Sequence, residues 1–365
     1  MKLQVHRTYN FNAGPSALPF SVLEKAQAEL IDFRGTGMSV MELSHRSRTY
    51  EEVHNQAINN MKELLSIPDT YEILFLQGGA SLQFSMIPMN FLKSGKKASY
   101  VMTGSWSEKA FSEAKLFGDV YHAASTKEGN YRSIPKIDQL QYNAEDTYLH
   151  LTSNNTIYGT QWTDFPDSGD VPLIADMSSD ILSRPIDVNK FALIYAGAQK
   201  NLGPSGVTVV IIRKDLLEQA NTSVPTMLKY STYAKNNSLY NTPPTFGIYM
   251  LGEVLNWVRE LGGLTAISER NEQKAKLIYE AIDSSNDFYI GHADKDSRSL
   301  MNLTFNLKTE ELEKKFLEQA KKEGFVGING HRSIGGCRVS SYNAVPIEAC
   351  KAFSEFMIDF QTKNS

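Results

Sequence analysis

The chain has 365 residues, of which 41% are hydrophobic and 21% charged, and its formal net charge is -4. This length predicts about two domains with a large core, and the lack of basic clusters argues against nucleic acid as a partner. The two cysteines, Cys337 and Cys350, lie too far apart in sequence for a short metal-ligand motif, which argues against a zinc site or a disulfide framework and fits a reducing compartment.

The amino-terminal half predicts alternating helices and strands. The first residues lack the apolar core of a signal peptide and no apolar run is long enough to span a bilayer, so we expect a cytoplasmic protein without a membrane partner. Apolar spacing predicts a helix over residues 20–33, and Thr49 with Glu52 forms a capping box for a helix that runs toward Leu65. Strands over 71–77 and 98–103 alternate with helices over 80–92 and 107–117, the order typical of a mostly parallel sheet covered on both faces.

The carboxy-terminal half predicts a different organisation. Residues 213–245 are rich in loop signals, and helices follow over 245–261 and 265–283. A strand over 300–307, a charged helix over 309–323, an extended segment over 338–341 and a closing helix from Pro346 complete the chain. We therefore predict an α/β fold with a large domain over residues 16–258 and a smaller α+β domain over 259–365. Residues 1–15 are predicted to belong to the smaller domain.

Lys200 lies between two apolar runs that read as buried strands. The first run covers residues 191–196, the chain reverses through Gly-Pro-Ser-Gly at 203–206, and the second run covers 207–212. The reversal predicts one antiparallel strand, with the amine at a hairpin tip. A partly desolvated lysine has a lowered pKa, and its neutral amine can attack an aldehyde to form a Schiff base; the alternative is a solvated turn lysine.

Asp176 ends another buried-strand pattern, at residues 171–175. Strand ends of this kind line the ligand crevice of open α/β sheets. Pyridoxal phosphate needs a lysine for its aldehyde and an acid that keeps its ring nitrogen protonated, and such an ion pair at about 4 Å contributes roughly 4 kcal/mol at an effective dielectric near 20. The alternative for Asp176 is a helix N-cap or a turn carboxylate.

Three further segments carry candidate residues, and the first two of them follow predicted strands. Gln77-Gly78-Gly79-Ala80-Ser81 opens a helix, where free backbone N–H groups favour a phosphate, and it matches neither a dinucleotide fingerprint nor a P-loop. Trp106 could stack on a flat ring or belong to the core or an interface. Thr156 could donate a hydrogen bond to a phenolic oxygen or cap a turn.

Two His-Arg dipeptides, His45-Arg46 and His331-Arg332, stand among small residues. A guanidinium beside an imidazole can grip a dianionic phosphate, so their meeting in space would indicate a phosphorylated substrate; a solvated surface pair is the alternative. Arg338 lies in a small, apolar segment and needs a carboxylate, supplied by the protein or by an amino acid substrate.

Five segments together carry a resemblance to a known family: NFNAGP at residues 10–15, SVMELSHR at 39–46, LSRPID at 182–187, YAGAQKN at 195–201 and NTPPTF at 241–246. Over about residues 9–361 the chain resembles the phosphoserine aminotransferases, which are class V aminotransferases of pyridoxal-phosphate fold type I and homodimers with sites at the subunit interface. Ala13 stands where relatives often have serine.

The resemblance implies a role for each candidate residue. Lys200 would carry pyridoxal phosphate, Asp176 would pair with its ring nitrogen, Trp106 would stack on the ring and Thr156 would lie near the phenolic oxygen. The cofactor phosphate would be met by Ala80, Ser81 and Gln199, with Asn241 and Thr242 of the other subunit. The substrate carboxylate would be bound by Arg338, and the substrate phosphate by His45 and Arg46 of one chain with His331 and Arg332 of the other.

The activity implied is reversible amino transfer between L-glutamate and 3-phosphohydroxypyruvate, giving O-phospho-L-serine and 2-oxoglutarate in serine biosynthesis, with 4-phosphohydroxythreonine of pyridoxine biosynthesis as a further candidate substrate. The alternatives are another class V enzyme, such as a cysteine desulfurase or an alanine-glyoxylate type aminotransferase, and a catalytically silent pyridoxal-phosphate protein. A nicotinamide-dependent dehydrogenase is disfavoured because the dinucleotide fingerprint is missing.

Overall fold

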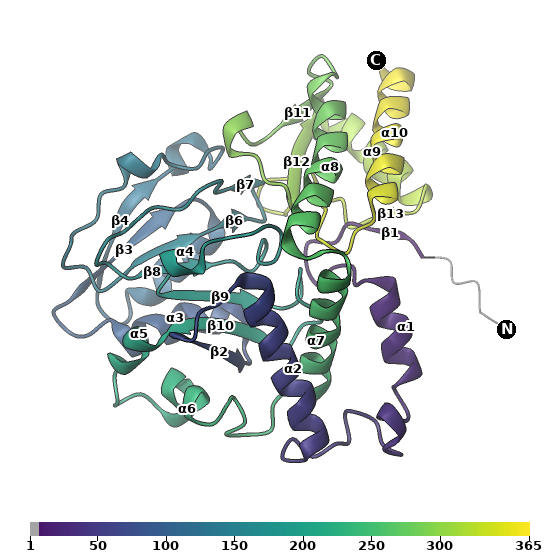
Figure 1. Cartoon of the computed structure of the whole chain (residues 1–365). Helices are drawn as coiled ribbons and strands as arrows, with labels where there is room; N and C mark the ends of the chain where they lie inside the picture. Colours follow the sequence, from purple (N-terminus) through teal and green to yellow (C-terminus); the bar gives the residue numbers. More distant parts are fainter. Residues whose placement is uncertain (1–6) are drawn as a thin grey trace.

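The computed structural model describes residues 7–365 and is built around one large sheet (Figure 1). Its seven strands stand in the order β2-β10-β9-β8-β5-β3-β4. All neighbours are parallel except β10, which runs antiparallel to both β2 and β9. The predicted single antiparallel strand is thus confirmed. The strands are β2 (Tyr71–Leu76), β3 (Lys97–Met102), β4 (Asp119–Ser125), β5 (Leu149–Thr152), β8 (Leu173–Asp176), β9 (Leu193–Gly197) and β10 (Thr208–Arg213).

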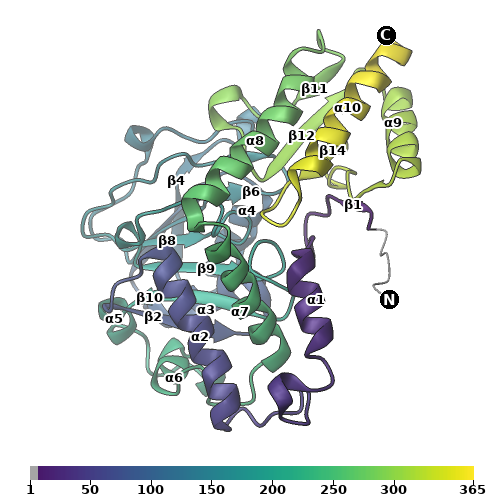
Figure 2. The ribbon, with the colours of Figure 1, turned by 45° about the vertical axis from the view of Figure 1, so that its right-hand side comes forward.

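Helices cover both faces of this sheet (Figure 2). On β2, Ile73 and Phe75 face one core while Leu74 and Leu76 face the other, because successive side chains of a strand point to opposite faces. The first core is closed by α2 (Arg48–Leu65), α7 (Thr245–Glu260) and the start of α8 (Gly263–Asp283). The second core is closed by α3 (Gly79–Phe91), α4 (Ser105–Ala114), α5 (Lys214–Glu218) and α6 (Tyr230–Lys235).

A second layered unit follows in the carboxy-terminal part. Its antiparallel sheet has the order β11-β12-β14 and packs on the far half of α8 and on two further helices. The elements are β11 (Tyr289–Gly291), β12 (Asn302–Leu307), α9 (Glu310–Lys322), β13 (Phe325–Val326), β14 (Cys337–Ser340) and α10 (Ile347–Asn364). Because α8 contributes to both cores, it joins the two units, and the domain boundary at residues 258–259 stays a prediction.

The amino-terminal segment crosses from the second unit to the first. The short β1 (Tyr9–Asn10) pairs with β13, and Phe11 belongs to the second core. From there α1 (Phe20–Ala28) packs with α2 and α7 in a smaller cluster. Residues 9–11 therefore lie beside the carboxy-terminal unit, and the chain then passes the carboxyl ends of the large sheet at Ser16.

Several predicted boundaries are wrong for local reasons. The helix over 20–33 ends at Ala28, and a single 3-10 turn, η1 (Phe33–Gly35), follows. Ser47, and not Thr49, caps α2, since its hydroxyl accepts from the Tyr50 N–H. The loop-rich region 213–245 contains α5 and α6, and the turn at Lys200 is a longer loop over residues 198–207.

The remaining elements are short. They are the strands β6 (Asn154–Asn155) and β7 (Thr160–Gln161) and the 3-10 turns η2 (Lys127–Gly129), η3 (Ile137–Gln139), η4 (Val188–Lys190), η5 (Thr226–Leu228) and η6 (Lys295–Ser297). Within residues 7–365, every helix is too short or too polar to cross a membrane.

Candidate active site

Lys200 lies in the loop that leaves β9, at the carboxyl end of the parallel strands. Its side chain is half-buried, and its Nζ donates a hydrogen bond to the Thr156 hydroxyl at 2.8 Å. Burial lowers the pKa of the ammonium to about 8; the nearby Arg338 charge acts in the same direction, and the Asp176 carboxylate opposes it. The amine is therefore presented as the sequence predicts, at the edge where open α/β sheets bind ligands.

The amino-terminal segment holds this lysine in place. The Ser16 hydroxyl donates to the Lys200 carbonyl at 2.7 Å, and the Ser16 N–H donates to the Gln199 carbonyl at 3.0 Å. A Cβ on Gly14, whose φ is +134°, would lie 3.3 Å from Lys200 Cγ. Neither Gly14 nor Ser16 was predicted to have a role, although both lie in or beside the first of the five matching segments.

Asp176 ends β8, the strand next to β9, and its side chain is only 5% exposed. Burial raises the pKa of its carboxyl group, while hydrogen bonds from Ser178 and Tyr195 and the charge of Lys200 oppose that rise. The backbone N–H of Ser178 donates to Asp176 Oδ1 at 2.9 Å. A carboxylate that receives these donors has a fixed orientation and, next to Lys200, a cationic neighbour.

Trp106 occupies the first turn of α4, directly after β3. The Lys200 ammonium lies 6.0 Å from the centroid of its ring, and the Lys109 ammonium lies 4.3 Å from it. The indole Nε1 is buried, and no hydrogen-bond partner for it occurs among residues 7–365. An unpaired buried donor beside a half-buried lysine fits a site completed by a ligand.

The turn between β2 and α3 has the form of an anion site. Gly78, at φ +87°, is the N-cap of α3, so the first N–H groups of the helix, including those of Ala80 and Ser81, lack intrahelical partners. The Gln199 amide folds against Gly197, where a Cβ would lie 2.6 Å from Gln199 Oε1. The helix N-terminus favours negative charge at this point.

Arg338 lies on β14 and is a partly buried cation. Its Nη1 donates to the Thr156 carbonyl at 3.4 Å, and its Nε is buried without a partner in the described part of the chain. The ion pairs found among residues 7–365 do not include Arg338, and burial lowers the pKa of its guanidinium group. Of the two carboxylates that the sequence left open, the structure favours that of a ligand.

The structure places one of the two His-Arg dipeptides beside Arg338. Burial and the positive charges of Arg338, Arg332 and Lys109 lower the pKa of the His331 imidazole, so these cations lie within electrostatic range of one another. Arg332 is exposed, and His331 Nδ1 contacts the Ser333 hydroxyl at 2.7 Å. A cluster of positive side chains on α4, β14 and the preceding loop therefore faces the region around Lys200.

Four predicted residues remain apart from Lys200 within the single chain. His45 is half-buried with an unpaired Nε2, and Arg46 is exposed in the loop before α2. Asn241 and Thr242 lie before α7, where the Asn241 amide donates to the Thr242 carbonyl at 3.4 Å. The contacts of the described residues do not join any of these four to the site.

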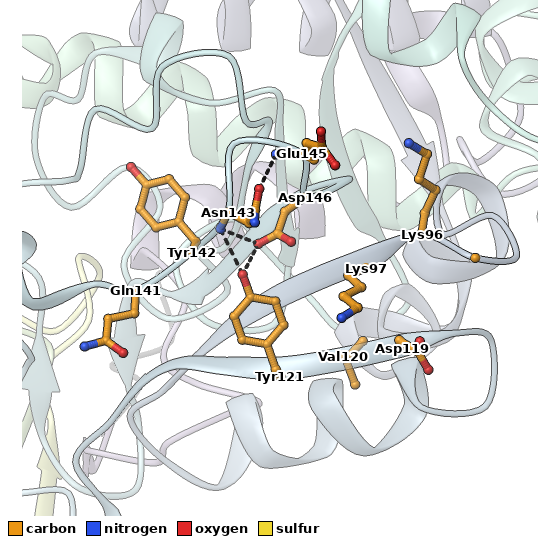
Figure 3. A pocket seen from close by; sticks show the side chains of 11 residues that line it. Lys96, Lys97, Asp119, Val120, Tyr121, Gln141, Tyr142, Asn143, Glu145 and Asp146 are labelled. Carbon is orange, nitrogen blue, oxygen red and sulfur yellow. Dashed lines mark hydrogen bonds between the residues drawn. The ribbon is translucent and has the colours of Figure 1, made fainter.

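A separate groove of about 970 Å³ lies at the opposite, amino-terminal ends of β3 and β4 (Figure 3). Tyr121 donates to Asp146 at 2.5 Å, and the Asn143 N–H donates to both, so the polar groups at its centre satisfy one another. Lys96 and Lys97 line it together with the acidic residues Asp119 and Glu145. The candidate active site is therefore the cluster around Lys200, not this groove.

Comparison with known proteins gives consistent matches over the whole chain. Residues 8–353 match the family described as Aminotransferase class-V. The phosphoserine aminotransferase of Lysinibacillus sphaericus (strain C3-41) is 70% identical over 358 residues, which cover 98% of this chain and 99% of that protein. The phosphoserine aminotransferase of Bacillus subtilis (strain 168) is 60% identical, with 99% and 100% of the two chains covered.

Solved structures agree with the sequence matches. Phosphoserine aminotransferase from Bacillus circulans subsp. alkalophilus has a TM-score of 0.97 at 60% identity, covering 98% of this chain and 99% of that chain. The PLP-bound phosphoserine aminotransferase from Trichomonas vaginalis has a TM-score of 0.92 at 41% identity, covering 96% and 100%. An alanine–glyoxylate aminotransferase from Nostoc, at 16% identity and a TM-score of 0.78, shares the fold alone.

Proposed function

The chain belongs to the class-V aminotransferases, and from this premise we propose that it transfers an amino group reversibly between L-glutamate and 3-phosphohydroxypyruvate, yielding O-phospho-L-serine and 2-oxoglutarate. The full-length relatives at 60–70% identity are phosphoserine aminotransferases, which favours this reaction over that of a desulfurase or an alanine-glyoxylate type enzyme. The observation that carries the proposal is that Lys200 and Asp176 stand at the ends of two neighbouring strands, β9 and β8.

The residues around Lys200 fit pyridoxal phosphate. Lys200 would hold its aldehyde, Asp176 its ring nitrogen, and the unpaired Trp106 indole would lie over its ring. The N-terminus of α3, with Ala80, Ser81 and Gln199, would hold its phosphate. When bound, this cofactor supplies an electron sink for the charge that develops at the α-carbon of the substrate.

Lys200 has a second task in the proposed reaction. Once released from the cofactor, its amine takes the proton from the α-carbon of the amino acid substrate. With a pKa of about 8, an appreciable fraction of the amine is neutral near physiological pH, which is the range in which a general base is effective. Asp176 acts through its negative charge, which favours the protonated form of the cofactor ring.

The positive cluster would bind the two anionic ends of the substrate. Arg338, partly buried and without an acidic partner in the described chain, would bind the α-carboxylate. His331 and Arg332 would bind the phosphate, together with His45 and Arg46 of a second chain, and Asn241 and Thr242 of that chain would reach the cofactor phosphate. 4-Phosphohydroxythreonine carries the same two anionic groups, so it is a further candidate substrate.

We also propose that the enzyme is a homodimer with shared sites. The surface formed by α1 and the loop before α2 exposes several large apolar side chains, and Ile31 is 86% exposed. Such a patch is typical of an interaction surface. The apolar residues are Phe20, Leu30, Ile31, Met38 and Met41, and they lie in the same part of the chain as His45 and Arg46.

The direct test is an assay of phosphoserine with 2-oxoglutarate, with unphosphorylated serine as the comparison. We expect turnover with phosphoserine and little with serine, and no turnover for Lys200→Ala. The matched control is Lys214→Ala, since Lys214 is also a lysine at the large sheet but pairs with Glu72 at 3.3 Å. Retained transamination in Lys200→Ala, or equal rates with serine and phosphoserine, would contradict the proposal.

The shared site has its own test. Lys200→Ala and Arg46→Ala are both expected to be inactive or weak alone, and mixed dimers of the two should regain activity. In such a dimer, the site that keeps Lys200 receives Arg46 from the other subunit. No recovery in a mixed dimer confirmed by mass spectrometry would mean that each site is built from a single chain.

A further inference from the structure

A hydrogen-bonded group lies behind Asp176, within the sheet. Asp176 on β8 is in register with Tyr195 on β9 and with Thr152 on β5, and His150 is two residues before Thr152. Residues two apart on a strand share a face, so Asp176, Tyr195 and His150 all point toward the core under α3 and α4. Their exposed fractions of 5%, 0% and 1% exclude bulk water from all three side chains.

His150 and Tyr195 are in hydrogen-bond contact, and Tyr195 is the register neighbour of Asp176 on the next strand. His150 Nε2 lies 2.9 Å from the Tyr195 hydroxyl oxygen. The negative charge of Asp176 adds to burial in raising the pKa of the Tyr195 phenol, so the two side chains interact across the strands. The Tyr100 ring stacks on the His150 ring at a centroid distance of 4.8 Å and fixes its plane.

The number of available protons allows only one consistent direction for the hydrogen bonds among His150, Tyr195 and Asp176. A phenol has one proton to donate, and burial lowers the pKa of His150 to about 3, so that the imidazole is neutral with a single N–H. His150 Nδ1 is buried and has no partner among residues 7–365. If Tyr195 donated to His150, an N–H at Nδ1 would be buried without an acceptor, and a phenol lone pair would face the Asp176 carboxylate.

We propose that His150 and Tyr195 are positioning residues for the aminotransferase reaction: His150 donates from Nε2 to Tyr195, Tyr195 donates to Asp176, and this fixed direction keeps the carboxylate charged and aimed at the cofactor ring nitrogen. The inference rests on the proposed function, because Asp176 needs a cationic ring partner for the arrangement to matter. The Ser178 N–H, which donates to Asp176 Oδ1 at 2.9 Å, favours the charged carboxylate in the same way.

The first test determines the tautomer of His150 in the cofactor-free protein. Long-range ¹H–¹⁵N NMR of protein labelled in its seven histidines distinguishes protonated from bare ring nitrogens, and His150→Gln assigns the signal. We expect the proton on Nε2 at neutral pH. A proton on Nδ1 would overturn the proposal, whatever reaction the enzyme performs.

The second test compares two variants that each remove one buried hydroxyl from the same face. Tyr195→Phe should weaken pyridoxal phosphate binding about tenfold or more, as expected for the loss of a hydrogen bond to a charged group. Tyr148→Phe is the matched control, because the Tyr148 hydroxyl bonds the Tyr100 hydroxyl at 2.8 Å and, among residues 7–365, no hydrogen bond joins it to Asp176. Thermal unfolding of both cofactor-free variants corrects for a general loss of stability.

Equal cofactor affinities for the wild-type protein, Tyr195→Phe and Tyr148→Phe would refute the positioning role while leaving the proposed function intact. If the wild-type protein itself did not bind pyridoxal phosphate, the proposed function would fail and the positioning role with it. If Tyr195→Phe did not fold, the tautomer measurement on the wild-type protein would still decide the direction of the hydrogen bonds.

Discussion

The lowered pKa of Lys200 predicts an unusual pH dependence for its reaction with an aldehyde. With a pKa of about 8, roughly 9% of the amine is neutral at pH 7 and roughly 91% at pH 9, so the rate should rise about tenfold and then level off. An ordinary lysine with a pKa near 10.5 would be roughly 0.03% neutral at pH 7 and roughly 3% at pH 9, a rise of about 100-fold without a plateau.

The assay uses cofactor-free protein and pyridoxal, which lacks the phosphate whose own titration would complicate the profile. Borohydride trapping followed by peptide mass spectrometry gives the labelled fraction of Lys200 at each pH. Arg338→Gln should move the plateau to higher pH, because it removes a positive charge that lowers the pKa of Lys200. Asp176→Asn should move it to lower pH. A 100-fold rise in the wild-type protein would show that the lysine is solvated and would refute the reasoning.

Three further outcomes are expected. Arg46→Ala and Arg332→Ala should each raise KM for phosphoserine about tenfold or more and change KM for glutamate much less, because each removes charge-assisted hydrogen bonds to phosphate. Gly14→Ala should cost about 1–3 kcal/mol of stability and weaken cofactor binding, because φ is +134° and the new Cβ would crowd Lys200 Cγ at 3.3 Å. The free energy of unfolding should fall by up to about 3 kcal/mol between pH 6.5 and pH 4 because of His54. Burial lowers the pKa of His54 to about 4 in the folded protein, whereas the unfolded chain binds this proton near pH 6.5. His54→Gln should therefore flatten this part of the plot of stability against pH.

Each of these has a control. Arg48→Ala removes an exposed arginine near Arg46 that already pairs with Glu52 at 3.2 Å, and it should leave both KM values unchanged. Gly169→Ala, at φ +59° with open space around the new Cβ, should lose stability without losing cofactor affinity. Equal KM changes for glutamate and phosphoserine would contradict the role of the two arginines in phosphate binding. Unchanged stability of Gly14→Ala would contradict the explanation from backbone strain. Identical dependence of stability on pH in His54→Gln and the wild-type protein would contradict the role of His54.

The sequence predicted the residues that stand at the ends of buried strands. Lys200 and Asp176 were identifiable because an apolar run stops at each of them, and the parallel order of the strands implied that their ends meet at one edge. The pattern could not show Tyr195 and His150 behind Asp176, because a buried tyrosine or histidine within a strand reads only as core.

Elements without periodicity were missed. A two-residue strand such as β1 has no pattern of its own and forms only because β13 offers it a partner. The helices α5 and α6 lie among proline and asparagine residues that read as loop. Ser47 rather than Thr49 caps α2 because the helix begins two residues earlier than predicted. The proposed meeting of the two His-Arg dipeptides would depend on a second chain, which a single sequence does not specify.

The pairing of the first strand with β13 sets an order of events during synthesis. Tyr9 emerges from the ribosome early, but its partner Phe325 follows only after about 15–60 s at roughly 5–20 residues per second. Until then the segment that clamps the reactive lysine through Ser16 is anchored only on its α1 side, and the Ala13 carbonyl lacks the Tyr342 hydroxyl that donates to it. A nascent chain should therefore be unable to capture its vitamin-derived cofactor before release, which couples loading to the completion of translation.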